Sequence, residues 1–258
     1  MLRSSCLQRR LTRLQGEAES IRRCEAWDSS SEVTFKIASL NCAGLKSHID
    51  DITGDDKLLK GDCLLFQETS LNNGESLRIP NYRENSYTSF GNGKGVASYS
   101  RKISMNVESR SERKVQVMKT SFDKIDIINV YRSADGSKTA LVENLKHLIQ
   151  EGKATVIAGD FNICGRAESQ DIVLKYIAQN GFTKMNEEPT QIQGRQIDHL
   201  IINQPSLVRG VERYSLYYTD HDALLLTLQL QVVSNLNKYI HFSQCFQVSS
   251  NDSSEDEW

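Results

Sequence analysis

The stretch Gly159-Asp160-Phe161-Asn162 decides the expected fold, because it closes a short apolar strand with two polar side chains. It follows residues 154–158 (ATVIA), a run whose length and β-branching suit a strand inside a sheet. Residues two apart face the same side of an extended backbone, so Asp160 and Asn162 point together. A carboxylate beside an amide can hold a water, a hydroxyl or a hard cation. The tetrapeptide by itself is more typical of a turn, so its meaning depends on the segments that meet it.

The length and composition of the chain fit one soluble globular α/β domain. The chain has 258 residues, of which 38% are hydrophobic and 25% are charged. No run approaches the length of a membrane span, so we expect no membrane partner. The six cysteines form no C-x-x-C pair, which fits a reduced, intracellular protein better than a disulfide scaffold or a zinc site.

The charges divide the chain into three segments. Residues 1–31 form a basic extension with six arginines against four acidic residues, and residues 234–258 form a polar, acidic tail that we expect to be disordered. The folded domain between them, residues 32–233, is close to neutral, which argues against bulk capture of nucleic acid but allows a local basic strip. The extension fits either a solvated helical arm or an organelle presequence, so a nuclear location is expected, with a mitochondrial one as the alternative.

Strand and helix patterns alternate through the folded domain. Strands are predicted at 33–40, 63–66, 95–99, 115–121, 126–131, 154–158, 197–202, 211–217 and 223–230, and helices at 48–52, 141–149 and 168–179. Many strands with few helices favour two packed sheets with the helices outside.

Several predicted strands end or begin in polar residues. These residues are Asn41, Glu68, Tyr131, Asp160, Asn162, Asp198, Asp220 and His221. Strand ends gather at one rim of a sheet, where active sites lie. Carboxylate and amide oxygens suit Mg²⁺ or Mn²⁺, and a histidine beside a carboxylate can stabilise a charged phosphate. The inventory suits metal-assisted hydrolysis of a phosphodiester.

Six short motifs in order carry a family resemblance. They are Leu40-Asn41-x-x-Gly44-Leu45, Gln67-Glu68-Thr69, Val130-Tyr131, Gly159-Asp160-Phe161-Asn162, Ile197-Asp198-His199 and Thr219-Asp220-His221-Asp222. Across residues 33–230 the chain resembles the endonuclease/exonuclease/phosphatase superfamily, and within it the apurinic-endonuclease-like nucleases of mobile elements such as non-LTR retrotransposons and helitron-like transposons. The resemblance implies a four-layer α/β sandwich, with two facing mixed β-sheets flanked by helices.

The resemblance also implies a role for each matching residue. Asn41, Glu68 and Asp220 would hold the Mg²⁺ or Mn²⁺ ion. Asp160 would orient or deprotonate the attacking water, which Asn162 would position. His221, oriented by Asp198, would contact the scissile phosphate, and Tyr131 would steady that phosphate as charge develops. His199 receives no role and is interpreted as a structural residue.

The implied activity is that of a magnesium-dependent endonuclease. It would nick DNA as a monomer and leave a 3′-hydroxyl and a 5′-phosphate. An RNA exonuclease or deadenylase, a phospholipid phosphodiesterase, and a non-catalytic nucleic-acid-binding module of the same fold remain as alternatives. The short span from Asn41 to His221 puts abasic-site specificity in doubt.

A basic cluster lies over a predicted hairpin between residues 101 and 119. Its members are Arg101, Lys102, Arg110, Arg113, Lys114 and Lys119. They either line a nucleic-acid backbone or form a solvated face of mixed charge.

Overall fold

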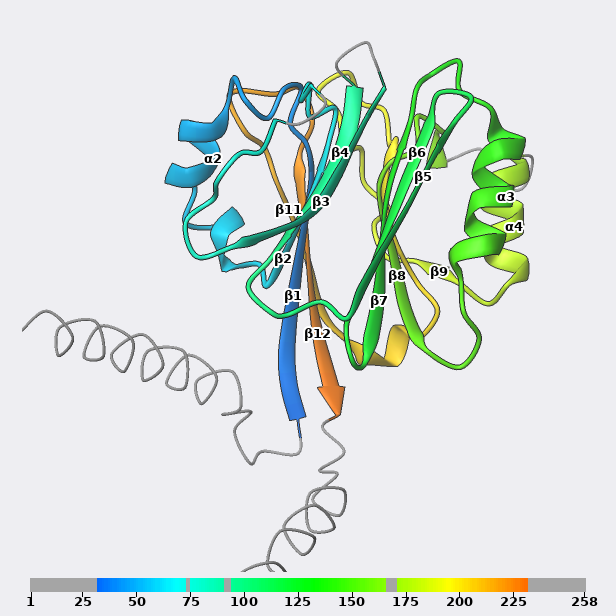
Figure 1. Ribbon diagram of the computed structural model, residues 1–258. Helices are drawn as coiled ribbons and strands as arrows, with labels where there is room; N and C mark the ends of the chain where they lie inside the picture. The colour runs from blue at the N-terminus through cyan, green and yellow to red at the C-terminus, as the bar shows by residue number, and fades with distance from the viewer. Residues whose placement is uncertain (1–31, 73–74, 91–93, 166–170, 232–258) are drawn as a thin grey trace, which may run out of the picture. The chain divides into compact units, whose positions relative to one another are not determined.

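The computed structural model describes residues 32–72, 75–90, 94–165 and 171–231 (Figure 1). Residues Thr34–Leu230 form one compact unit. The predicted N-terminal extension and acidic tail lie outside the described residues. The described part of the chain contains no helix with the length and apolarity that crossing a bilayer demands.

Two mixed, six-stranded β-sheets build this unit. The first has the order β11-β12-β1-β2-β4-β3 and the second β5-β6-β7-β8-β10-β9. The first sheet consists of β1 (Glu32–Asn41), β2 (Cys63–Gln67), β3 (Arg83–Phe90), β4 (Lys94–Ser100), β11 (Val208–Tyr214) and β12 (Ala223–Gln231). The second consists of β5 (Asn106–Glu112), β6 (Val115–Ser121), β7 (Ile125–Arg132), β8 (Ala154–Asp160), β9 (Thr183–Lys184) and β10 (Asp198–Ile202). In each sheet one central pair runs parallel, β1 with β2 and β7 with β8.

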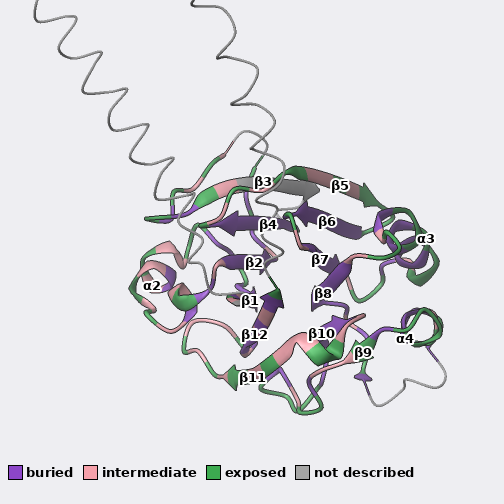
Figure 2. Cartoon of the chain, turned by 90° about the horizontal axis from the view of Figure 1, so that it is seen from below, coloured by how far each residue is buried: buried purple, intermediate pink, exposed green. Residues whose placement is uncertain are grey.

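The sheets face each other across an apolar core. Phe35 and Leu65 of the first sheet belong to one buried cluster with Ile127 and Val156 of the second. Side chains alternate along a strand, so Ile128 points the opposite way, into the cluster beneath the helices. Figure 2 shows the central strands buried and the edge strands β5 and β11 of intermediate burial or exposed. The central strands are apolar on both faces because one face packs against the other sheet and the opposite face packs against the helices.

Helices cover the outer faces of both sheets. The helices α3 (Lys138–Leu148) and α4 (Ile172–Gln179) pack on the second sheet, and α2 (Ile49–Gly54) packs on the first (Figure 1). The side chains of Ser137 and Asp171 cap α3 and α4 by accepting from backbone N–H groups in the first turn. The predicted four-layer sandwich is therefore confirmed.

Three features of the chain differ from the predicted elements. The strand expected at 211–217 lies instead at Val208–Tyr214, because its pairing with β12 begins at Val208 and stops at Tyr214. The polar strand β3 and the two-residue β9 carry no apolar periodicity and were not expected. The early part of the helix expected at 168–179 falls on residues outside the description, and α4 begins after Asp171.

A buried polar link joins the two sheets near the site. Gln67 Nε2, at the end of β2, donates to Asn129 Oδ1 of β7 over 2.6 Å. Asn129 Nδ2 in turn donates to the carbonyls of Phe66 and Ala97, at 3.1 and 3.0 Å. Because buried amides need partners, this network fixes how β7 sits against β2 and β4.

Candidate active site

The eight residues predicted for the site lie at strand ends that meet along one rim. Asn41 ends β1, Asp160 ends β8, and Asp198 begins β10. The strand register makes Asp160 a direct neighbour of both Tyr131 and Asp198. Glu68 follows the residue that pairs with Asn41, and His221 precedes β12.

The Asp160 carboxylate is fixed by three hydrogen bonds. Asn41 Nδ2, from the facing sheet, donates to Asp160 Oδ2 over 2.9 Å. The backbone N–H of Asn162 donates to Oδ1 over 2.8 Å, and its Nδ2 donates to Oδ2 over 3.1 Å. The pKa of Asp160 is raised overall. Burial raises it most and the charge of Asp198 next, and together they outweigh His221 and the hydrogen bonds, which lower it. The carboxylate therefore sits where positive charge would stabilise it.

His221 and Asp198 form a buried pair beside Asp160. The His221 Nδ1 lies 2.8 Å from Asp198 Oδ2, which also accepts from the Thr190 hydroxyl at 2.7 Å. Burial lowers the pKa of His221, but the hydrogen bond and charge of Asp198 outweigh it and raise that pKa to about 9. The imidazole is therefore charged near neutral pH, and its Nε2, 3.5 Å from Asn41 Nδ2, is left to face the site.

Glu68 and Tyr131 meet on the other side of the rim. The Tyr131 hydroxyl donates to Glu68 Oε1 over 3.0 Å, and Lys94 Nζ approaches the same oxygen at 3.2 Å. Burial raises the pKa of Tyr131, so its hydroxyl stays protonated as a donor. Lys94 was not predicted; it lies in a glycine-rich run that resembles an ordinary loop before a strand.

Asp220 is held by a residue that the sequence did not single out. Gln191 Nε2 donates to Asp220 Oδ2 over 2.7 Å, and Gln191 Oε1 accepts from Arg195 Nε at 2.7 Å. The backbones of Gln191 and His221 form an isolated antiparallel bridge, which brings this loop to the site. Asp220 also lines a cavity of about 300 Å³ together with Arg213.

The donor chemistry of the rim fits a divalent cation. Among the described residues, Asp160, Asp198 and His221 have possible ligand atoms within 4.8 Å of one another. His221 is a poor member of that group, because its Nδ1 is engaged with Asp198 and its raised pKa keeps it protonated. The remaining groups are the carboxylates of Glu68, Asp160 and Asp220 and the amide of Asn41, which are the hard oxygen donors that Mg²⁺ and Mn²⁺ prefer.

Comparison with known proteins shows what the fold is similar to. No known family model matches the sequence, and no curated protein sequence matches it either. The chain nevertheless has the fold of the endonuclease/exonuclease/phosphatase superfamily, to which its motifs pointed.

Three solved structures illustrate the likeness. The chain is similar to the endonuclease domain of TRAS1, a telomere-specific non-LTR retrotransposon, with 16% identity, a TM-score of 0.61, and coverage of 78% of this chain and 100% of that one. It is similar to an AP endonuclease from Archaeoglobus fulgidus, with 18% identity, a TM-score of 0.63, and 75% and 99% coverage. It is also similar to the 3′ phosphatase NExo from Neisseria, bound to a product DNA hairpin, with 17% identity, a TM-score of 0.60, and 74% and 98% coverage.

Proposed function

We propose that this protein is a divalent-metal-dependent phosphodiesterase, and specifically a DNA endonuclease that leaves a 3′-hydroxyl and a 5′-phosphate. The observation that carries the proposal is a buried cluster of three side chains. Asn41, at the end of β1, contacts both Asp160, at the end of β8 in the facing sheet, and His221, just before β12. Purely structural residues would not require two carboxylates and a charged imidazole at one buried place, because burying charge is costly.

The roles of the residues follow from their contacts. A Mg²⁺ or Mn²⁺ ion held by Asn41, Glu68 and Asp220 would neutralise charge developing on the phosphate. Asp160, with its raised pKa, is suited to take a proton from the attacking water near neutral pH. Asn162 holds that carboxylate through both its backbone and its side-chain N–H groups, which leaves its Oδ1 to position the water.

Two donors face the phosphate in this proposal. His221, held by Asp198, would donate from Nε2 to a non-bridging oxygen. Tyr131 would donate from its hydroxyl, which in the absence of substrate is directed to Glu68. His221 is held in place by Asp198, whereas Tyr131 would turn its hydroxyl from Glu68 to the phosphate.

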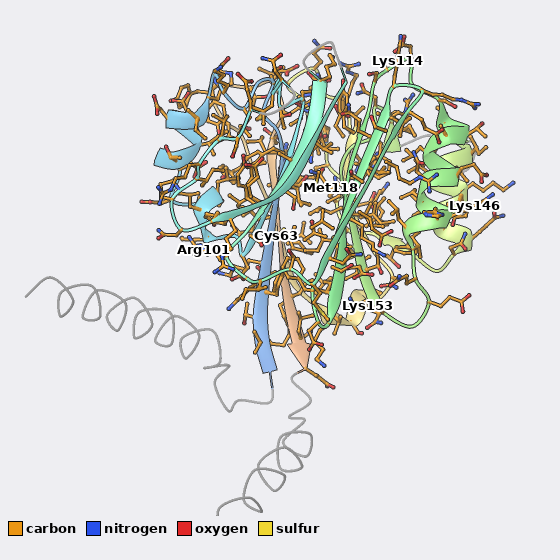
Figure 3. All side chains as sticks on the ribbon, viewed as in Figure 1. Cys63, Arg101, Lys114, Met118, Lys146 and Lys153 are labelled. Carbon is orange, nitrogen blue, oxygen red and sulfur yellow. The ribbon has the colours of Figure 1, made fainter. Side chains whose placement is uncertain are left out.

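Nucleic acid as the substrate is supported by part of the predicted basic cluster. Arg113 and Lys114 form the β5–β6 turn, and Ser133 N donates to Lys114 O over 3.0 Å, directly beyond the site strand β7. Figure 3 shows Lys114 and Arg101 at opposite ends of the strands, so the cluster is divided. Arg101 is engaged with the Leu59 carbonyl, and Lys119 is buried beside Asp126.

DNA rather than RNA is supported by the similar proteins. One of them is the endonuclease domain of a retrotransposon and another is bound to a DNA hairpin. The proposal assigns the activity to residues 32–233, acting as a monomer inside the cell, in the nucleus, with the basic extension and the acidic tail outside the catalytic domain.

The experiment incubates the protein with supercoiled plasmid in Mg²⁺, in Mn²⁺ and in EDTA. Metal-dependent nicking, with ends that a polymerase extends directly, is the expected result. Asp160→Ala should lose it. Absence of nicking in either metal, or equal nicking by wild type and Asp160→Ala, contradicts the proposal. The same buffer with poly(A) and with sphingomyelin shows whether RNA or a phospholipid is the substrate instead.

A further inference from the structure

Arg132 is a buried arginine whose partners are backbone carbonyls. It ends β7 with only 2% of its surface exposed. Its Nε donates to Phe161 O at 2.7 Å and its Nη2 to Asn162 O at 2.8 Å. Its Nη1 donates to Gly136 O at 2.6 Å and to Ala134 O at 3.2 Å.

The four carbonyls belong to two segments that leave the sheet at the site. Ala134 and Gly136 lie between β7 and α3, and Phe161 and Asn162 follow β8. The pairing of β7 with β8 ends at Tyr131 and Asp160, so all four carbonyls lie beyond it. The guanidinium therefore supplies hydrogen bonds that sheet pairing no longer provides.

Asn162 is bound to Arg132 at both of its ends. While its carbonyl accepts from the guanidinium, its side-chain Nδ2 donates to the Arg132 carbonyl over 2.9 Å. The backbone of Asn162 has a φ of 49°, a left-handed conformation that asparagine tolerates better than most residues other than glycine. In this conformation its N–H and Nδ2 reach both oxygens of Asp160.

We propose that Arg132 is a positioning residue, which sets the Asp160 carboxylate by locking Asn162 in its left-handed conformation. The inference depends on the proposed function only for the role of Asp160, which is to take a proton from the attacking water. The route is direct: guanidinium to Asn162 carbonyl, Asn162 amide to Asp160 oxygens, with every link a hydrogen bond of ordinary length.

The surroundings are shaped for an arginine. A planar guanidinium presents five N–H groups in a fixed fork, whereas a lysine ammonium has only three on one atom and cannot span two segments in the same way. A Cβ at Gly136 would lie 2.9 Å from Arg132 Cγ and 2.7 Å from Lys114 O. The loop therefore approaches the arginine too closely for any residue other than glycine at position 136. Arg132→Lys is therefore the informative change.

The matched control is Arg101→Lys. Arg101 also donates from its guanidinium to a backbone carbonyl, that of Leu59 at 2.5 Å, but it lies at the far end of the strands. Both variants and Arg132→Ala would be made in the full chain, and their thermal unfolding compared with wild type.

The first measurement does not depend on activity. In metal-free protein, NMR would follow the side-chain amide protons of Asn162 and the Nε–H of Arg132. In wild type both should be protected from solvent exchange. Arg132→Lys should shift and deprotect the Asn162 amide, and Arg101→Lys should leave it unchanged. An Arg132 Nε–H that exchanges freely in wild type would overturn the inference even if no Arg132 variant folds.

The second measurement is kinetic. A catalytic group moved by about 1 Å can lose on the order of 10²-fold in rate, so Arg132→Lys should lower kcat by about that factor with KM within twofold. Millimolar guanidinium should restore part of the kcat of Arg132→Ala, since it can occupy the vacated site. Unchanged kcat and an unchanged Asn162 amide in Arg132→Lys would refute the positioning role. Were wild type inactive on every substrate, the proposed function would fail while the NMR result still decided this inference.

Discussion

Asn41 and Asp160 lie 119 positions apart in the sequence and on different sheets, yet a hydrogen bond of 2.9 Å joins their side chains. The bond crosses from the end of β1 to the end of β8, so the candidate site spans both halves of the sandwich. Glu68 lies on the Asn41 side, and Tyr131 and Asp198 lie on the Asp160 side.

Glu68→Gln should weaken binding of Mn²⁺ to the protein. The substitution removes a negative charge from the proposed ligand set while keeping the shape, so affinity should fall by more than about tenfold. Isothermal titration calorimetry would measure it. Glu75→Gln is the control, because Glu75 is likewise paired with a lysine, Lys46, at 2.7 Å. Equal Mn²⁺ affinity in the Glu68 variant and wild type would remove Glu68 from the metal site.

Asp198→Asn should lower kcat of nicking by about 10²–10³-fold, because His221 loses the carboxylate that holds it charged and oriented. Single-turnover assays at saturating substrate would measure the rate. Asp222→Asn is the control, because Asp222 is also paired with a basic side chain, but that of Arg213 at 2.7 Å and not that of His221. A similar rate loss in both variants would mean that charge in this segment matters, and not the Asp198–His221 pair.

Gln191→Leu should weaken Mn²⁺ binding, because Asp220 Oδ2 then loses its 2.7 Å donor. Residues that orient metal ligands typically change affinity by about 10- to 100-fold. Titration with Mn²⁺ monitored by electron paramagnetic resonance would measure the change. Ile192→Ala, at the exposed next position, should have no effect. A Gln191 variant that binds Mn²⁺ like wild type would show that Asp220 needs no support or is not a ligand.

Arg113→Asn should raise KM for DNA without lowering kcat. Asparagine tolerates the left-handed conformation at this turn, where φ is 47°, so the change removes the charge alone. Loss of one phosphate contact should also reduce the salt dependence of binding by about one unit of slope. Fluorescence anisotropy over a range of salt concentrations would measure it. Arg101→Asn, at the other end of the strands, should leave KM and the salt dependence of binding unchanged. A larger effect of Arg101→Asn than of Arg113→Asn would mean that DNA binds at the Arg101 end instead.

Asn129→Leu should destabilise the fold. The leucine fills similar space but removes the partner of two carbonyls and leaves the Gln67 amide with only its 3.3 Å bond to Ser39 Oγ; a buried group left unpaired typically costs about 1–3 kcal/mol. Urea unfolding would measure the free-energy change. A variant as stable as wild type would mean that these groups find other partners.

Local sequence was enough to predict the strands that carry the site. Short apolar runs such as the one before Gly159 form buried strands, and the polar residue that ends each run lies at the rim by geometry alone. The same argument holds for Asn41 and Asp198, which end and begin their strands. The roles assigned to these residues stay predictions until they are measured.

The supporting residues could not be predicted in the same way. Gln191 carries no charge and reaches Asp220 only because its loop pairs with His221 across the fold. Lys94 lies in a run that resembles a loop, and its neighbour Glu68 is 26 positions away. The polar strand β3 shows no alternation because it lies at the sheet edge. For Gln191 and Lys94 the deciding contact is long-range, which periodicity and spacing do not encode.

The polar link from Gln67 to Asn129 has a consequence for anyone who wishes to shorten the protein. Half of the candidate site residues lie on one sheet and half on the other, and the hydrogen bond between the Gln67 and Asn129 amides holds the two sheets in a fixed relative position. Neither sheet alone contains the candidate site, and a chimaera must inherit both from a single parent to keep the distance between Asn41 and Asp160.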